Sequence, residues 1–156
     1  MDIQSKYPSE SAVKKTEIVF PNDANPMGML QGGRLIEWMD VAAAVCAQIH
    51  AGNISVTASI YEVEFFHPAT VGDIITIEAT ITRAFNSSME ILARAFGRKV
   101  KDSTNKKVGE AFLLFVAIDD QAKPILVPAV TPQTSEEIML YEQALERKNR
   151  KSSARK

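Results

Sequence analysis

Residues 25–40 of the chain have the sequence NPMGMLQGGRLIEWMD, in which three glycines precede a strongly apolar segment that contains Asp40. From about Gly33 onward, apolar residues recur at steps of four and three, which is the spacing of an amphipathic α-helix. We therefore expect a helix over residues 33–49 that is covered over much of its circumference. Its apolar stripe consists of Leu35, Met39, Ala42, Cys46 and Ile49, widened by Trp38 and Val45 on one side and by Ile36, Ala43 and Ala47 on the other.

The segments after this helix change from a period of 3.6 to a period of 2, which is typical of strands. Residues 75–82 and 89–95 alternate apolar and polar side chains around Asn86-Ser87, and this pattern predicts a β-hairpin. In residues 54–66 the apolar positions move from even to odd numbers, which predicts a bulge or a strong bend. Residues 111–118 are apolar on both faces. We expect a helix to cover one face of that strand and a second subunit to cover the other.

Two further elements complete the predicted order. A short strand is expected over residues 16–20, and a capping box of Thr134 and Glu137 opens a second, short helix that ends near Lys148. This order predicts an α+β fold, in which one antiparallel, strongly curved sheet of about five strands wraps round a long central helix and a C-terminal helix follows.

A chain of 156 residues with 46% hydrophobic content is expected to form one domain. We place this domain at residues 16–146. Residues 1–15 are polar and aperiodic and are expected to form a flexible N-terminus. Residues 147–156 are rich in Lys and Arg and are expected to form a basic flexible tail, with contact to phosphate or nucleic acid as the alternative.

Composition argues against several classes of function. The formal net charge of −1 and the pI of about 6.1 predict no nucleic-acid or anionic-membrane partner. The single cysteine, Cys46, leaves no intrachain disulfide and suits a reducing compartment, and with only His50 and His67 beside it no metal site is expected. The N-terminus lacks a signal-peptide pattern, and no run of about 18 apolar residues occurs. We therefore expect a soluble, cytoplasmic protein.

The glycines before the predicted helix suggest a site for an oxyanion. Gly28, Gly32 and Gly33 allow the backbone to approach a ligand closely, and a helix that starts near Gly33 presents unpaired N–H groups at the positive end of its dipole. Such donors stabilise a developing negative oxygen by about 3 to 4 kcal/mol in measured hydrolases. The alternative is that these glycines form a turn and allow tight helix packing. Neither pattern of a phosphate-binding loop is present.

Two polar residues are the candidates for proton transfer and orientation. Asp40 lies at the border between the apolar and polar arcs of the predicted helix, where a cleft would let its carboxylate take a proton from water. The alternative is a solvated aspartate on the edge of the helix, although aspartate is a poor residue for a helix interior. Asn25 offers both a donor and an acceptor and could orient a carbonyl or a water. Its alternative role is an Asx-type turn.

Other reactive side chains fit structural roles better. Cys46 lies in the middle of the apolar stripe and is expected to be an inert core thiol. His50 closes the helix, where histidine commonly binds C-terminal carbonyls, and His67 ends a strand. No G-x-S-x-G motif occurs, and neither histidine is paired locally with a nucleophile, so a Ser-His-Asp or Cys-His arrangement is not expected.

Several motifs in one order resemble the hotdog-fold acyl-CoA thioesterases of the bacterial YciA and mammalian cytosolic acyl-CoA hydrolase type. These motifs are PNDANPMGMLQGGRLIEWMD, FFHPATVGD, RAFNSSME, LFVAIDDQAKP and VPAVTPQTSEE. The resemblance implies that two subunits join their sheets edge to edge, with active sites at the dimer interface and dimers assembled as a trimer. It implies an acyl-CoA hydrolase that needs no metal or other cofactor and takes coenzyme A only as part of its substrate and product.

The resemblance also implies roles for individual residues. Asp40, in the Met-Asp pair of the helix, would activate water as general base, and Asn25 of the partner subunit would orient the reactants. The backbone of Gly32 and Gly33 would face the thioester oxygen. Ser87 and Ser88 would lie near bound coenzyme A. Gln31 departs from the family, in which many members carry Phe before the glycine pair.

Two alternative functions on the same fold stay open at this point. A hydratase or dehydratase of acyl thioesters would need a histidine in the reacting cleft, and FFHPATVGD lacks the histidine-centred Pro/Gly motif of the acyl-carrier dehydratases. A non-catalytic acyl-CoA-binding module is the other alternative, and the presence of both Asn25 and Asp40 argues against it.

Overall fold

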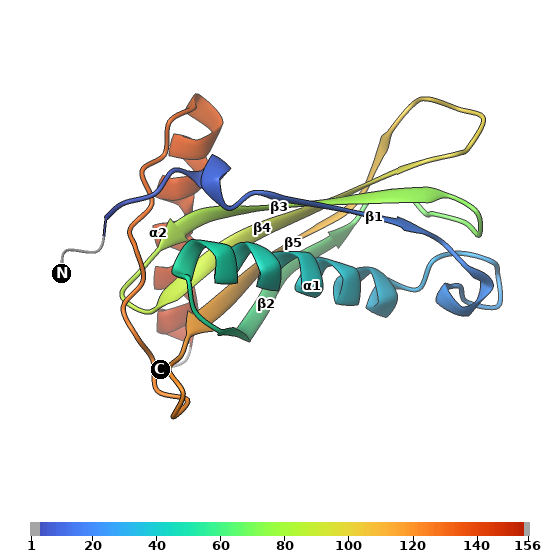
Figure 1. Ribbon diagram of the computed structural model, residues 1–156. Coiled ribbons are helices and arrows are strands. Elements are labelled where there is room, and N and C mark those ends of the chain that lie inside the picture. Colours follow the sequence, from blue (N-terminus) through green and yellow to red (C-terminus); the bar gives the residue numbers. More distant parts are fainter. Residues whose placement is uncertain (1–3, 155–156) are drawn as a thin grey trace.

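Five antiparallel strands wrap around one long helix in the computed structural model, which describes residues 4–154 (Figure 1). The sheet order is β1-β3-β4-β5-β2, so β1 and β2 are its edges. The elements in chain order are the 3-10 helix η1 (Pro8–Glu10), β1 (Val13–Ile18), the 3-10 helix η2 (Pro21–Asp23), α1 (Gly32–Ala51), β2 (Ser55–Phe65), β3 (Ile74–Ala84), β4 (Ser88–Arg98), β5 (Lys106–Ala117) and α2 (Ser135–Ala154). This arrangement confirms the predicted α+β fold with a curved sheet around a central helix.

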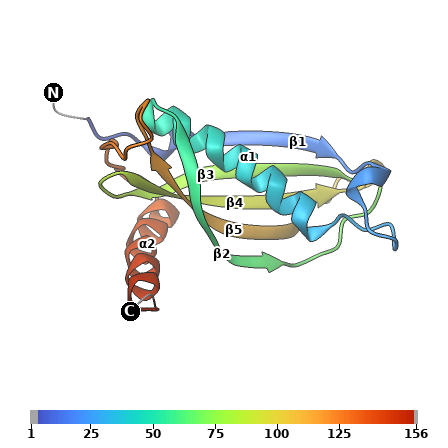
Figure 2. The same cartoon turned by 90° about the horizontal axis from the view of Figure 1, so that it is seen from below.

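Helix α1 packs along one face of the sheet, and α2 crosses the opposite face near the β3–β4 turn (Figures 1 and 2). In β3 the residues that face α1 are buried and alternate with less buried ones, and β3 pairs antiparallel with β4, which confirms the predicted hairpin. Many of the contacting residues are alanines, so the helix and the sheet approach each other closely. The main buried residues of this layer are Leu35, Met39, Ala42, Ala43 and Ala47 on α1, and Ile75, Ile77, Ile91, Ala93, Ala95, Leu113 and Phe115 on the strands.

Strand β2 contains the irregularity that the change of period predicts. Its pairing with β5 shifts between Thr57 and Ser59 and again between Tyr61 and Glu64. Glu62 has a φ of 50°, a left-handed conformation that costs energy for a residue with a side chain. The bulges bend β2 around α1.

One side of α1 remains exposed next to β2. Val41, Val45 and Ile49 are 47%, 40% and 50% exposed and lie on one stripe of the helix. The prediction that Ile49 lies in the core is therefore wrong, because the sheet covers the side of α1 that carries Ala43 and Ala47. Exposed apolar residues of this size mark an interaction surface when they gather together. We define the α1–β2 surface as Val41, Val45, Ile49, Ile54, Val56 and Ile60, all of which are exposed.

Helix α2 opens with the predicted capping box, because Glu137 N–H donates to Thr134 Oγ1 and Thr134 N–H donates to Glu137 Oε1. It continues to Ala154, beyond the predicted end at Lys148, and is as long as α1. It also covers part of the second face of β5, since Arg147 stacks on the ring of Phe112 at 3.8 Å. A second subunit as the cover of the rest of this face stays a prediction.

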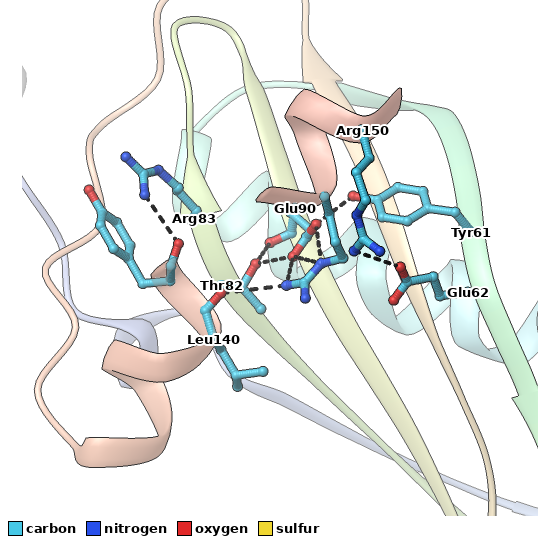
Figure 3. A network of polar contacts seen from close by, with 9 residues as sticks. Tyr61, Glu62, Thr82, Arg83, Glu90, Leu140 and Arg150 are labelled. Atoms are coloured by element: carbon cyan, nitrogen blue, oxygen red, sulfur yellow. Dashed lines mark hydrogen bonds and ion pairs between the residues drawn. The ribbon is translucent and has the colours of Figure 1, made fainter. Parts of the chain in front are cut away.

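A buried ion pair attaches α2 to the sheet (Figure 3). The side chains of Glu90 on β4 and Arg147 on α2 are 1% and 5% exposed, and Arg147 Nη2 donates to Glu90 Oε1 at 2.6 Å. Tyr61 and Thr82 hydroxyls also donate to the Glu90 carboxylate, at 2.6 and 2.7 Å. Burial and the adjacent negative charge of Glu90 raise the pKa of Tyr61.

The two chain ends differ from the sequence prediction. Lys6 N–H donates to the Ala129 carbonyl, and β1 already begins at Val13, inside the segment 1–15 that was expected to be a flexible N-terminus. Arg147 is buried although it was assigned to the flexible tail over residues 147–156. Residues 1–3 and 155–156 of these segments lie outside the described residues. Within residues 4–154, none of the helices is both long and apolar enough to span a bilayer.

Candidate active site

Asn25 shapes the loop that leads into α1. Its Oδ1 accepts from the N–H groups of Met27 at 2.9 Å and Met29 at 3.1 Å, which is the Asx-type turn considered as its alternative role. Gly28 completes the turn with a φ of 77°. The backbone N–H of Asn25 donates to the Met29 carbonyl at 2.7 Å, whereas its side-chain nitrogen Nδ2 makes no hydrogen bond within the described part of the chain. The turn therefore fixes the side chain through its oxygen and leaves an N–H₂ group that can donate to a ligand.

The N-terminus of α1 lies next to this loop. The Asp23 carboxylate pairs with Arg34 in the first turn at 3.2 Å, and Gln31 Nε2 donates to the Ala24 carbonyl at 3.0 Å. Gln31 is the N-cap, and its side chain makes no capping hydrogen bond. The first N–H groups of the helix therefore have no intrahelical acceptor. They are the donors that an oxyanion would need.

The two glycines at this terminus play different roles. A Cβ at Gly32 would lie 3.1 Å from the ring of Phe65, so Gly32 allows the close packing considered as the alternative. A Cβ at Gly33 would have no neighbour within 4 Å. Space for a ligand group is therefore present at Gly33.

Asp40 is half-buried and is held by a residue that the sequence analysis did not identify. Thr57, near the start of β2, donates its hydroxyl to Asp40 Oδ1 at 2.7 Å. This hydrogen bond orients the carboxylate and leaves its other oxygen available to a water. The sequence signal for Thr57 was hidden, because the change of period in residues 54–66 prevented the assignment of each residue to a face.

One chain does not bring all these groups to a single reacting atom. Asp40 is eight residues beyond Gly32 in the same helix, a separation of about 12 Å at 1.5 Å per residue. Asn25 and the helix N-terminus therefore form one group of polar atoms, and Asp40 with Thr57 forms a separate group.

A cavity of about 350 Å³ adjoins the helix N-terminus. Its walls are formed mainly by apolar residues. They are formed by Leu30, Gly32, Leu35, Phe65, Phe66, His67, Pro68, Ala69 and Val108.

Within one chain, Ser87 and Ser88 do not lie in the same site as Asp40. Both lie at the β3–β4 turn, and Ser88 pairs with Val116, which in turn pairs with Val56. Alternation along β4 directs Ser88 to the face of Glu90, opposite to α1. Their predicted contact with coenzyme A stays a prediction.

Cys46 has the buried environment that was expected, whereas His50 binds a distant loop carbonyl instead of the C-terminal carbonyls of its own helix. Cys46 is fully buried, and burial raises the pKa of its thiol to about 11. His50 is buried in the last turn of α1, where Nε2–H donates to the Pro128 carbonyl at 2.7 Å and burial lowers its pKa. His67 Nδ1–H donates to the Lys107 carbonyl at 2.9 Å at the rim of the apolar cavity. No cluster of three or more His, Cys, Asp or Glu suitable for a metal occurs among residues 4–154.

Comparison with protein families and relatives finds similarity to thioesterases and acyl-CoA hydrolases. Residues 27–102 match the thioesterase superfamily. The chain is 38% identical over 152 residues to the uncharacterized acyl-CoA thioester hydrolase YkhA of Bacillus subtilis, covering 95% of this chain and 88% of that protein. It is 34% identical to the mouse acyl-coenzyme A thioesterase 11 over 91% of this chain, but it spans only 24% of that longer protein.

Solved structures agree with this comparison. An apo-hexameric acyl-CoA thioesterase superposes with a TM-score of 0.93 at 40% identity, covering 97% of this chain and 98% of the other. The acyl-CoA hydrolase of Staphylococcus aureus in complex with butyryl coenzyme A and coenzyme A superposes with a TM-score of 0.90 at 36% identity, covering 97% and 92%. That hydrolase was also solved with an asparagine, an aspartate or a threonine replaced by alanine. These three positions are separated by 15 and 17 residues, as are Asn25, Asp40 and Thr57.

Proposed function

Because the chain belongs to the thioesterase superfamily of hotdog-fold acyl-CoA hydrolases, we propose that it hydrolyses acyl-CoA thioesters to a carboxylic acid and coenzyme A. The observation that carries this proposal is the half-buried Asp40 carboxylate held by Thr57 at 2.7 Å. The proposal is also supported by the spacing of Asn25, Asp40 and Thr57, which equals the spacing of the asparagine, aspartate and threonine replaced in the S. aureus hydrolase.

In the proposed mechanism, Asp40 acts as general base. Its free oxygen accepts a proton from a water, and the water oxygen attacks the thioester carbonyl carbon. The carbonyl oxygen becomes negative and is stabilised by the N–H groups at Gly32 and Gly33, while the amide of Asn25 orients the reactants. The intermediate collapses when the carbon–sulfur bond breaks, and the proton on Asp40 passes to the leaving thiolate. The products are the acid and coenzyme A, and no cofactor is consumed.

We propose that two subunits share each site, with Asp40 from one and Asn25 from the other. Strand β2 is an edge whose outer side is unpaired within the described chain, and the α1–β2 surface lies beside it. If two β2 edges pair antiparallel about a two-fold axis near Tyr61, the Thr57 end of one strand lies opposite the Phe65 end of the other. Phe65 touches Gly32, so this symmetry brings Asp40 and Thr57 of one chain to the helix N-terminus of its partner.

The higher assembly and the cellular setting are part of the proposal. The similarity to an apo-hexameric thioesterase supports a trimer of such dimers. The net charge of −1 and the absence of a long apolar stretch in the sequence support a cytoplasmic enzyme that has neither nucleic acid nor membrane as a partner.

The proposed activity is tested with purified protein, a panel of acyl-CoAs and a thiol reagent that detects released coenzyme A. We expect turnover of at least one acyl-CoA. Binding of acyl-CoA without turnover would instead support a non-catalytic module. Because His67 lies at the rim of the cavity, the panel includes an enoyl-CoA, and hydration of its double bond without release of thiol would support a hydratase.

The sharing of sites between subunits is tested by mixing two inactive variants. We expect co-expressed Asn25→Ala and Asp40→Ala chains to recover about a quarter of wild-type turnover, because half of the dimers are mixed and each of these has one intact site of two. Each variant expressed alone is the control. If both residues acted within one chain, every site in the mixture would lack one of them, and no recovery would be seen.

Thr57 is expected to act by holding Asp40. Thr57→Val keeps the shape of the side chain but removes the hydroxyl, and a hydrogen bond to a charged group contributes about 1.5 to 3 kcal/mol. We expect kcat to fall by about tenfold or more while the affinity for coenzyme A stays constant. Thr57→Ser keeps the donor and is the matched control. Equal kcat values for the valine and serine variants would contradict the role assigned to the hydroxyl.

A further inference from the structure

The apolar cavity begins at the proposed position of the thioester. Gly32 lies in its wall, at the helix terminus whose N–H groups are the proposed oxyanion donors. Phe65, Phe66, Leu30 and Leu35 are among its other lining residues. A hydrocarbon chain attached to a carbonyl at Gly32 would enter this cavity directly, and apolar walls favour such a chain over one with polar substituents.

Val108 on β5 forms the inner wall of this cavity. Next to it lies a second cavity of about 160 Å³, whose lining includes the charged side chains of Asp73, Arg98 and Lys99. Val108 borders both cavities, together with the segment from His67 to Ala69. A chain that grew past Val108 would therefore leave apolar surroundings and displace water from charged groups, which is unfavourable.

The position of Val108 is fixed by its neighbours. It is 5% exposed, and its carbonyl accepts a hydrogen bond from Phe66 N–H at 2.8 Å. Its Cγ2 lies 2.8 Å from the place where Gly97 would carry a Cβ, so the side chain rests directly on the backbone of β4. This packing prevents the side chain from moving toward β4.

We propose that this cavity binds the acyl chain of the substrate and that Val108 sets the maximum chain length. The inference rests on the proposed thioesterase function and specifies its substrate class, which is acyl-CoA with an unsubstituted, straight chain. A methylene group has about the volume of one water in the liquid, about 30 Å³. The cavity of about 350 Å³ therefore has room for roughly ten carbons, which corresponds to short and medium chains.

The chain-length profile follows from the burial of methylene groups. Each methylene that enters the cavity is expected to raise kcat/KM by about fourfold, the factor that corresponds to its transfer from water. The rise in kcat/KM should stop when the acyl chain reaches Val108. Still longer chains should have the same kcat/KM or a lower one.

The test compares kcat/KM over a series of saturated acyl-CoAs from two to sixteen carbons for the wild type and three variants. Val108→Ala opens the wall, and we expect the optimum to move to chains at least two carbons longer, with the ratio of long-chain to short-chain kcat/KM raised by tenfold or more. Val108→Ile fills the cavity and is expected to shorten the optimum, and it keeps the proposal testable if the alanine variant does not fold. Val127→Ala is the matched control, because Val127 is similarly buried, at 7% exposed, but does not line either cavity.

Two negative results have different meanings. If wild-type protein hydrolyses acyl-CoAs but the folded Val108 variants keep its chain-length profile, the acyl-chain site is overturned and the thioesterase function stands. If wild-type protein hydrolyses none of the acyl-CoAs, the proposed function itself fails.

Discussion

Asp40→Asn is expected to reduce kcat for acyl-CoA hydrolysis by roughly 10²- to 10⁴-fold, the range measured for the loss of a positioned general base. Asparagine has the shape of aspartate and can still accept the hydrogen bond that Thr57 donates at 2.7 Å. It cannot take a proton from water at neutral pH. The site would therefore keep its geometry and lose the group that activates the nucleophile.

The measurement is steady-state release of coenzyme A, combined with binding of coenzyme A to the same variant. We expect the dissociation constant of coenzyme A to change by less than about threefold, because the residues predicted to contact coenzyme A, Ser87 and Ser88, do not include Asp40. Glu37→Gln is the matched control, since Glu37 is another α1 carboxylate but is 61% exposed and pairs with Arg34. If Asp40→Asn retained wild-type kcat, the carboxylate would not be the base.

Glu90→Ala is expected to cost about 3 to 5 kcal/mol of unfolding free energy, the range measured when one partner of a buried ion pair is removed. The loss leaves Arg147 charged in a site where its side chain is 5% exposed, and it also removes the acceptor of the Tyr61 and Thr82 hydroxyls. For a chain of this size, such a loss lowers the midpoint of thermal unfolding by roughly 6 to 20 °C.

The measurement is equilibrium denaturation by urea, with Glu136→Ala as the control. Glu136 also joins α2 to the sheet, and its Oε1 accepts from Arg94 at the same 2.6 Å. Its side chain is 55% exposed, however, so we expect its removal to cost less than about 1 kcal/mol. The double variant Glu90→Leu with Arg147→Met should recover much of the loss, because two apolar residues leave no buried charge. Equal effects of Glu90→Ala and Glu136→Ala would show that burial of the ion pair contributes little.

Periodic features of the chain were predictable because their signal is local. The alternation in residues 75–82 follows directly from one buried face of β3, and the capping box at Thr134 needs only residues three apart. The altered phase in residues 54–66 likewise predicted the bulges of β2.

Other features depend on contacts between distant residues. Arg147 was assigned to a solvated basic tail because its neighbours in sequence are charged, and its partner, Glu90, is 57 residues away. Ile49 fits the apolar stripe of α1 as well as Met39 does, and only the curvature of the sheet decides which side is covered. No local pattern contains either kind of information.

The candidate site shows the same division. Asp40 could be singled out because an aspartate at the border of an apolar helix face is unusual, whereas Thr57 is one of several threonines in strands until the bend of β2 brings it to Asp40. Asn25 turned out to form the Asx turn and to keep a free donor as well, so its two interpretations are compatible.

The burial of Cys46 has a practical consequence for every assay described above. It is the chain's single sulfhydryl, it is 0% exposed, and burial raises its pKa to about 11. A colorimetric disulfide reagent added to the folded enzyme should therefore register only the released product. In a sample that has lost its native packing, the reagent would also react with Cys46, one thiol per chain, before any substrate is added. The absorbance of the substrate-free control therefore reports whether the enzyme is folded.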